Sequence, residues 1–165
     1  MFELKPLSPE AIPAALEKAT RYRLLNEPSE AESICLDVLR TEPDHQQALV
    51  ILLLALTDRF SRGYGVSDTQ SQELLPRLHN DYDRTYYAGI ICERKAKARL
   101  HQGGPGAGFN AFDLFREAMT WFEKAEKIRP AGNDDALLRW NTCARIIARN
   151  QLESRPQESG QLSLE

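Results

Sequence analysis

The sequence has little of the chemistry from which most catalytic and metal sites are built. Its 165 residues include only three histidines and three cysteines, and no two of these six lie one helical turn apart. Cys35, Cys92 and Cys143 are separated by 57 and 51 residues, a spacing found in neither a zinc knuckle nor a redox pair. We therefore expect three buried, reduced thiols, with no metal, no cofactor and no catalytic residues.

Long apolar runs and an excess of basic charge are also missing. The longest uninterrupted apolar run covers nine residues, Ala48 to Leu56, whereas a membrane span needs about 20. Residues 1–6 lack the basic region and apolar segment of a secretory signal. The net charge of −3 disfavours a general binder of nucleic acid or of anionic membranes. We therefore expect a cytoplasmic protein with neither a nucleic-acid nor a membrane partner.

Most of the chain instead shows helical periodicity. Apolar residues recur at intervals of three and four, and proline, glycine and capping residues interrupt them. The pattern predicts an all-α fold with seven helices and no sheet, over residues 9–25, 29–42, 44–60, 67–82, 83–100, 110–128 and 133–150. The third helix contains the apolar run, so it should lie in the middle of the molecule. The predicted core comprises Leu52, Leu53, Leu56, Phe115, Phe122 and Trp140.

Two segments lack this periodicity. Gly103–Gly108 holds four glycines and a proline, and we expect a mobile, dispensable insertion there, ended by Asn110 as the cap of the next helix. A phosphate-binding loop would need Gly-Lys followed by serine or threonine, but Phe109 and Asn110 follow Gly108. Residues 151–165 read as a polar, disordered tail.

The predicted helices recur in units. Units begin near residues 9, 45, 83 and 134, at intervals of 36, 38 and 51 residues, which is the range of helical-hairpin repeats. The spacing of the second helix and closing proline of a tetratricopeptide repeat occurs twice, at Ala31, Cys35, Val38 and Pro43 and again at Ala118, Phe122, Ala125 and Pro130. The chain thus resembles a tetratricopeptide-repeat protein. The resemblance implies a domain over residues 1–150 in which three antiparallel hairpins and a C-terminal capping helix stack as a short right-handed superhelix.

The resemblance also implies a concave groove that binds an extended or helical segment of another protein. Its lining would be Leu16, Arg23, Gln47, Val50, Leu54, Asp58, Lys95 and Arg145, with Thr20, Ala88, Cys92, Leu138 and Thr142 between them. Arg23, Lys95 and Arg145 occupy equivalent positions, so we expect a basic rim and an acidic partner. The lysine/asparagine clamp of chaperone-binding members is not matched, because its positions hold Leu16, Thr20 and Leu54.

One stretch departs from the acidic character of the chain. Between Arg84 and Arg99 there are five basic residues and a single acid, Glu93. This pattern is typical of a solvated helix face; the alternative is an electropositive surface that selects an acidic partner. Arg94 lies near an apolar stripe, so we expect its side chain either to reach out to water or to pair with a carboxylate at the edge of the core.

The sequence leaves three functions open. The first is a non-catalytic protein–protein interaction module or adaptor. The second is a self-associating structural protein, whose groove is filled by its own tail or by a second copy. The third, a small helical enzyme, is the least favoured, because no nucleophile–base or metal constellation is visible.

Overall fold

The computed structural model describes residues 1–63 and 65–157, with the backbone alone at 65 and 66. In this part of the chain there are seven α-helices, three short 3-10 helices and no strand, which confirms the all-α class. The α-helices are α1 (Ile12–Leu24), α2 (Pro28–Thr41), α3 (Gln46–Asp58), α4 (Gly65–Leu74), α5 (Asp81–Gln102), α6 (Ala107–Lys127) and α7 (Asp135–Arg149). The 3-10 helices are η1 (Pro9–Ala11), η2 (Phe60–Arg62) and η3 (Leu75–Arg77).

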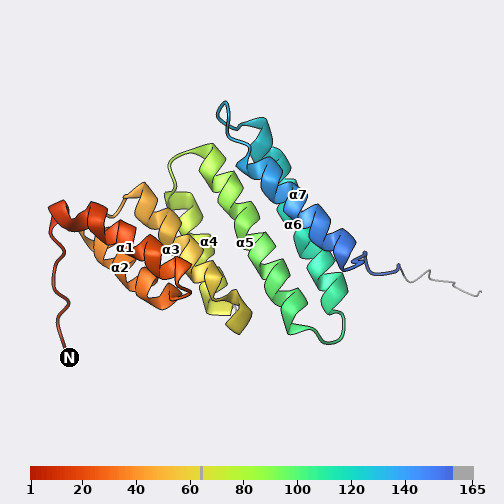
Figure 1. The fold of residues 1–165 in the computed structure, drawn as a ribbon, viewed down its shortest axis with the longest axis horizontal. Coiled ribbons are helices and arrows are strands. Elements are labelled where there is room, and N and C mark those ends of the chain that lie inside the picture. Colours follow the sequence, from red (N-terminus) through yellow and green to blue (C-terminus); the bar gives the residue numbers. More distant parts are fainter. Residues whose placement is uncertain (64, 158–165) are drawn as a thin grey trace, which may run out of the picture.

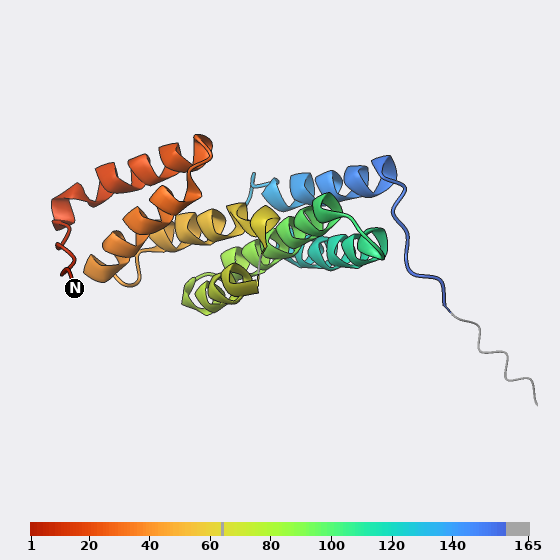
Figure 2. The ribbon, with the colours of Figure 1, turned by 90° about the horizontal axis from the view of Figure 1, so that it is seen from below.

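The helices form an elongated row that follows the order of the chain (Figure 1). Short connections make sequential neighbours pack together: α1 on α2, α2 on α3, α3 on α4, α5 on α6 and α6 on α7. α3 also contacts α1 and α5, so these three helices form a continuous layer. Seen from below, α1 and α7 lie on one side of the row, whereas α4 and α6 lie on the other (Figure 2).

Helix boundaries differ from the sequence expectation where two residues could each serve as a cap. α3 is capped by His45, whose Nδ1 accepts the N–H of Ala48 at 3.2 Å, and not by Asp44. His45 has the extended backbone that an N-cap requires. Asn80 caps α5 by accepting the N–H of Asp83 at 2.7 Å. α4 ends at Leu74 and not at residue 82, because Pro76 cannot continue the helix and the chain tightens there into η3.

The glycine-rich segment is a short, organised turn and not a long insertion. Only residues 103–106 lie outside the helices, because α6 begins at Ala107 and not at Asn110. Gly103, Gly104 and Gly106 have φ values of 68°, 88° and 74°, a region that side chains disfavour. Arg99 donates to the carbonyl oxygens of Gly103 at 2.7 Å and of Pro105 at 3.3 Å. The extra residues of the third unit therefore lengthen α5 and α6, which contain 22 and 21 residues.

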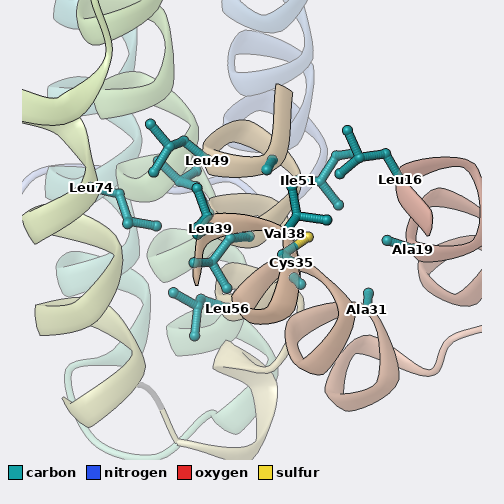
Figure 3. Close-up of a cluster of buried hydrophobic side chains, with 14 of the residues drawn as sticks. Leu16, Ala19, Ala31, Cys35, Val38, Leu39, Leu49, Ile51, Leu56 and Leu74 are labelled. Carbon is teal, nitrogen blue, oxygen red and sulfur yellow. The ribbon is translucent and has the colours of Figure 1, made fainter. Parts of the chain in front are cut away.

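The apolar interior consists of two clusters that meet at α5. The first joins α1 to α4 with Ile91 and Ala98 of α5, and Figure 3 shows its labelled side chains converging between the helices. The second joins α5, α6 and α7, and Leu54 and Tyr87 pack against both. Five predicted core residues, Leu52, Leu53, Leu56, Phe115 and Phe122, are confirmed as buried. Trp140 is only half-buried, because its indole N–H donates to Glu123 at 3.0 Å.

The predicted tail begins where α7 ends. Its described part, residues 151–157, lies against the start of α6: Leu152 packs on the second cluster, and the guanidinium of Arg155 stands 5.2 Å from the centre of the Phe109 ring. Residues 158–165, for which the sequence predicts disorder, lie outside the described residues.

α5 and α6 approach each other closely at Gly89. A Cβ atom at this position would lie 2.6 Å from Cε1 of Phe122, whose ring is fully buried. We expect Gly89→Ala to lower the free energy of unfolding by about 1–2 kcal/mol, because overpacking outweighs the better helix propensity of alanine. Gly108→Ala is the control, since a Cβ there meets Leu152 at an ordinary 3.7 Å. Urea denaturation of both variants measures the change in the free energy of unfolding. A Gly89→Ala protein as stable as wild type would contradict the close packing of Gly89 against Phe122.

All three cysteines are unpaired and buried. Burial raises the pKa of Cys35, Cys92 and Cys143 from 9.0 to about 12. At pH 8 the folded protein should therefore react with a thiol reagent roughly a thousandfold more slowly than after unfolding. The protonated thiols favour the folded state below about pH 9, and this contribution is lost as the pH rises from 9 toward 12. Stopped-flow measurements of the thiol reaction with and without guanidinium give the ratio of the two rates. A folded protein that reacts as fast as the unfolded protein would contradict the prediction.

Candidate functional site

Asp58 connects three helices through two arginines. It stands in the last turn of α3, where the helix dipole disfavours a negative charge and makes cationic partners valuable. Arg23 of α1 donates to both carboxylate oxygens, at 2.7 Å from Nε and 3.2 Å from Nη2. Arg94 of α5 donates from Nη1 to Asp58, to the Leu54 carbonyl at 3.0 Å and to the Thr57 hydroxyl at 2.9 Å. Burial lowers the pKa of Arg94, and the Asp58 carboxylate opposes that shift.

Glu93, the residue before Arg94, is completely buried and forms a second network. Arg139 of α7 donates to both of its carboxylate oxygens, at 3.0 Å from Nε to Oε1. Lys97 donates to Oε2 at 3.2 Å, and the Cys143 thiol lies 3.6 Å from Oε1. Burial lowers the pKa of Arg139, but the hydrogen bond and charge of Glu93 more than offset this, so the pKa is raised. Glu93 is thus the charge that attaches α7 to α5.

The two networks together carry more positive than negative charge. Four cations, Arg23, Arg94, Lys97 and Arg139, surround two carboxylates, Asp58 and Glu93. We call the surface formed by the four cations and Asp58, on α1, α3, α5 and α7, with the buried Glu93 beneath it, the ion-pair face. Its surplus of two positive charges contrasts with the net charge of −3 of the whole chain. All four cations are partly exposed, up to 42% for the Lys97 side chain.

Aromatic side chains lie between the two networks. Tyr82 and Tyr86 stack at 5.7 Å between ring centres, and Tyr87 meets Tyr86 edge-on at 5.0 Å. Tyr86 lies within reach of the charges of Asp135 and Arg139, and Tyr87 within reach of those of Asp83, Asp135 and Arg23. Burial raises the pKa of Tyr87 to about 12, which keeps its hydroxyl protonated near neutral pH. Half-buried tyrosines beside arginines are the composition that protein-binding surfaces favour.

A cleft opens beside the ion-pair face, between the end of α3, η2 and the second half of α5. Its volume is about 430 Å³, and we call it the α3–α5 cleft. It is lined by Thr57, Asp58, Phe60, Ser61, Arg94, Lys97, Ala98 and His101. The charged members belong to the two networks just described, so the cleft is continuous with the ion-pair face.

The structure brings together only some of the residues that the sequence placed in a groove. Arg23 and Asp58 form an ion pair, and Leu54 lies beside them through its carbonyl contact with Arg94. Val50 is half-buried, and Gln47 and Arg145 are exposed on α3 and α7. Leu16 is only 2% exposed and belongs to the first apolar cluster, so it is not available to a partner.

Lys95 does not share a surface with Arg23, which corrects the predicted basic rim. Its ammonium lies 3.0 Å from Asp68 of α4, on the side of α5 that also carries Ala88 and Cys92. Those two buried side chains help to line a second cleft, of about 470 Å³, between η3 and α6. The predicted register of α5 was therefore shifted by one residue, because Arg94 occupies the place assigned to Lys95.

Three contributors to the site, Glu93, Lys97 and Arg139, were not predicted. One sequence feature could have indicated Glu93: it is the single acid within a basic stretch, and a carboxylate among cations is expected to pair with them. Nothing in the local sequence of α7 indicates that Arg139, and not Arg145, would reach it.

The described residues contain neither a group of metal ligands nor a helix that could span a membrane. Within residues 1–63 and 65–157 no three histidine, cysteine, aspartate or glutamate side chains are grouped closely enough to hold a metal ion. In the same ranges, every helix is too short or too polar to cross a bilayer. Comparison of the chain with protein-family models, curated proteins and solved structures finds no match.

The Glu93 network gives a prediction on stability. We expect Arg139→Ala to lower the free energy of unfolding by about 3 kcal/mol, because it leaves a buried carboxylate with Lys97 as its one cationic partner among the described residues. Adding Glu93→Gln should recover part of this loss, since the uncompensated charge is then removed. Arg145→Ala, an exposed change on the same helix, should stay within about 0.5 kcal/mol of wild type. Chemical denaturation of the four proteins tests this, and equal effects of the two arginine changes would contradict it.

Proposed function

We propose that this protein is a non-catalytic interaction module that binds an acidic segment of a partner protein on its ion-pair face. The observation that carries the proposal is the surplus of two positive charges on partly exposed arginine and lysine side chains. Complementary charge steers encounter and selects among partners. Tyr86 and Tyr87 beside these cations would supply the apolar contact area that charge alone does not.

The fold supports the same proposal. Sequential helices pack in pairs, and α1, α3 and α5 form one layer, as a tetratricopeptide-like superhelix of three hairpins requires. In that arrangement α7 would cap the array, and the ion-pair face would be its concave side. Because one hairpin cannot bury its own apolar faces, stacking leaves a long surface that is available to a partner. Three unpaired cysteines fit a reducing compartment, so we place the protein in the cytoplasm.

Self-association is the second candidate, and one observation favours it. Leu24, Leu25 and Leu36, on or next to α1 and α2, are 81%, 64% and 48% exposed, and a second copy would remove them from water. The described part of the chain's own tail lies against α6 and not in the α3–α5 cleft, so residues 151–157 do not fill the groove. A dimer through the leucines would leave the ion-pair face free for a partner.

A peptide titration tests the proposed function. The probe is a 12-residue peptide of glutamate and leucine, blocked at both ends, and the control replaces each glutamate by glutamine. We expect amide shifts in two-dimensional NMR spectra to map onto α1, α3, α5 and α7 with the acidic peptide only. Affinity should fall about tenfold between 50 and 300 mM salt, since the charges are partly exposed.

Two results would contradict the proposal. Shifts confined to α2, α4 and α6 would place binding on the opposite side of the row. Equal binding of the glutamine peptide would remove the role of charge. Sedimentation of the free protein distinguishes the second candidate, because self-association predicts a concentration-dependent dimer that leucine-to-serine changes at 24 and 25 abolish.

A further inference from the structure

Arg94 uses only one of its three guanidinium nitrogens to hold the fold. Nη1 makes all of its hydrogen bonds, to the Leu54 carbonyl, the Thr57 hydroxyl and Asp58. Nε and Nη2 have no hydrogen-bond partner in the described chain. Both are accessible to solvent, because the one buried side-chain nitrogen or oxygen without a partner in the described residues is Nε of Arg59. Arg94 lines the α3–α5 cleft and its side chain is 24% exposed, so free donors of this guanidinium are available next to the cleft.

The rest of the cleft adds donors and no free carboxylate. Lys97 makes one hydrogen bond, to Glu93 at 3.2 Å, so its ammonium retains two further donors. Ser61 and His101 bring a hydroxyl and an imidazole to the same lining. Asp58 also lines the cleft, but both of its oxygens already accept from Arg23 and Arg94. The lining contains two cations, Arg94 and Lys97, and one carboxylate, Asp58. It therefore has one positive charge in excess.

We propose that the α3–α5 cleft binds the side-chain carboxylate of an aspartate or glutamate in the partner segment. Nε and Nη2 lie on one edge of the planar guanidinium and can donate two parallel hydrogen bonds to the two oxygens of a carboxylate. The three bonds of Nη1 fix that edge before binding, so little side-chain entropy is lost when the anion arrives. Lys97 supplies a third donor and balances the charge.

The lining's excess of one positive charge matches the single charge of a carboxylate. A phosphate group carries close to two negative charges at neutral pH and is the competing ligand in the test. The identity of the partner rests on the proposed function, whereas the anion site can be tested alone.

A small probe tests the anchor, by which we mean the binding of one side-chain carboxylate in the α3–α5 cleft, separately from the rest of the partner. The probe is N-acetylglutamate N-methylamide, whose only charge is its side-chain carboxylate, and the control is the corresponding glutamine derivative. The experiment follows the Nε–H signal of Arg94 and the amides of Ser61 and Ala98 by NMR. We expect saturable shifts with the glutamate probe, with a dissociation constant of about 1–10 mM, and none with glutamine.

Two lysine variants on the same helix provide the matched comparison. Lys97→Gln should weaken the glutamate probe about threefold to tenfold, because a donor and a charge leave the cleft. Lys95→Gln should leave it unchanged, because Lys95 faces Asp68 on the other side of α5. Arg94→Lys keeps the charge and removes the paired donors, so binding should fall at least tenfold, with the amide spectrum confirming that the variant is folded.

Several outcomes would overturn the anchor. These are equal shifts with glutamine, equal weakening by the two lysine variants, or binding of N-acetylglycine, a terminal carboxylate, in place of the glutamate probe. Tighter binding of phosphoserine than of glutamate would also overturn it. If the acidic peptide binds the ion-pair face while the glutamate probe does not shift the cleft, the anchor fails and the proposed function stands. If the probe binds and the peptide does not, the anion site stands and the proposed function fails.

Discussion

Glu93 and Arg94 are adjacent on α5, yet they pair with helices on different sides of it. Successive side chains on an α-helix point about 100° apart, so one residue reaches α7 and the next reaches α3. Through Arg139, Glu93 attaches the last helix, and through Asp58, Arg94 attaches α3 and, by way of Arg23, α1. α5 is also where the two apolar clusters meet, so the polar and apolar connections between the halves of the molecule run through one helix.

This arrangement links the stability of the fold to the charge of its surface. A carboxylate removed from water needs a paired charge and hydrogen bonds to its oxygens, and each of the two carboxylates has two cations for this: Arg23 and Arg94 around the partly exposed Asp58, Lys97 and Arg139 around the buried Glu93. The cations are long enough to hold the carboxylate while part of the side chain remains at the surface. The surplus of positive charge on the ion-pair face is therefore a consequence of how the helices are held together.

The fold was predictable to the extent that it depends on local periodicity. Leu53 and Phe122 could be assigned to the core because apolar intervals of three and four define one face of a helix. Helix ends were less predictable, because Asp44 and His45 are both capable caps and backbone geometry chose between them. The segment around Gly106 was read as an insertion because its glycines permit many backbone conformations; the positive φ values and the contacts of Arg99 with the Gly103 and Pro105 carbonyls show an organised turn.

The amino-acid sequence by itself determined an all-α chain of seven helices, a buried third helix and the unusual position of Arg94. Only the tertiary structure decided which charges meet. Arg139 and Glu93 are 46 residues apart, and Arg94 and Asp58 are 36 apart. Contacts over such separations depend on the rotation of each helix about its own axis. A shift of one residue, as between Arg94 and Lys95, moves a side chain by more than a quarter of a turn and onto a different neighbour.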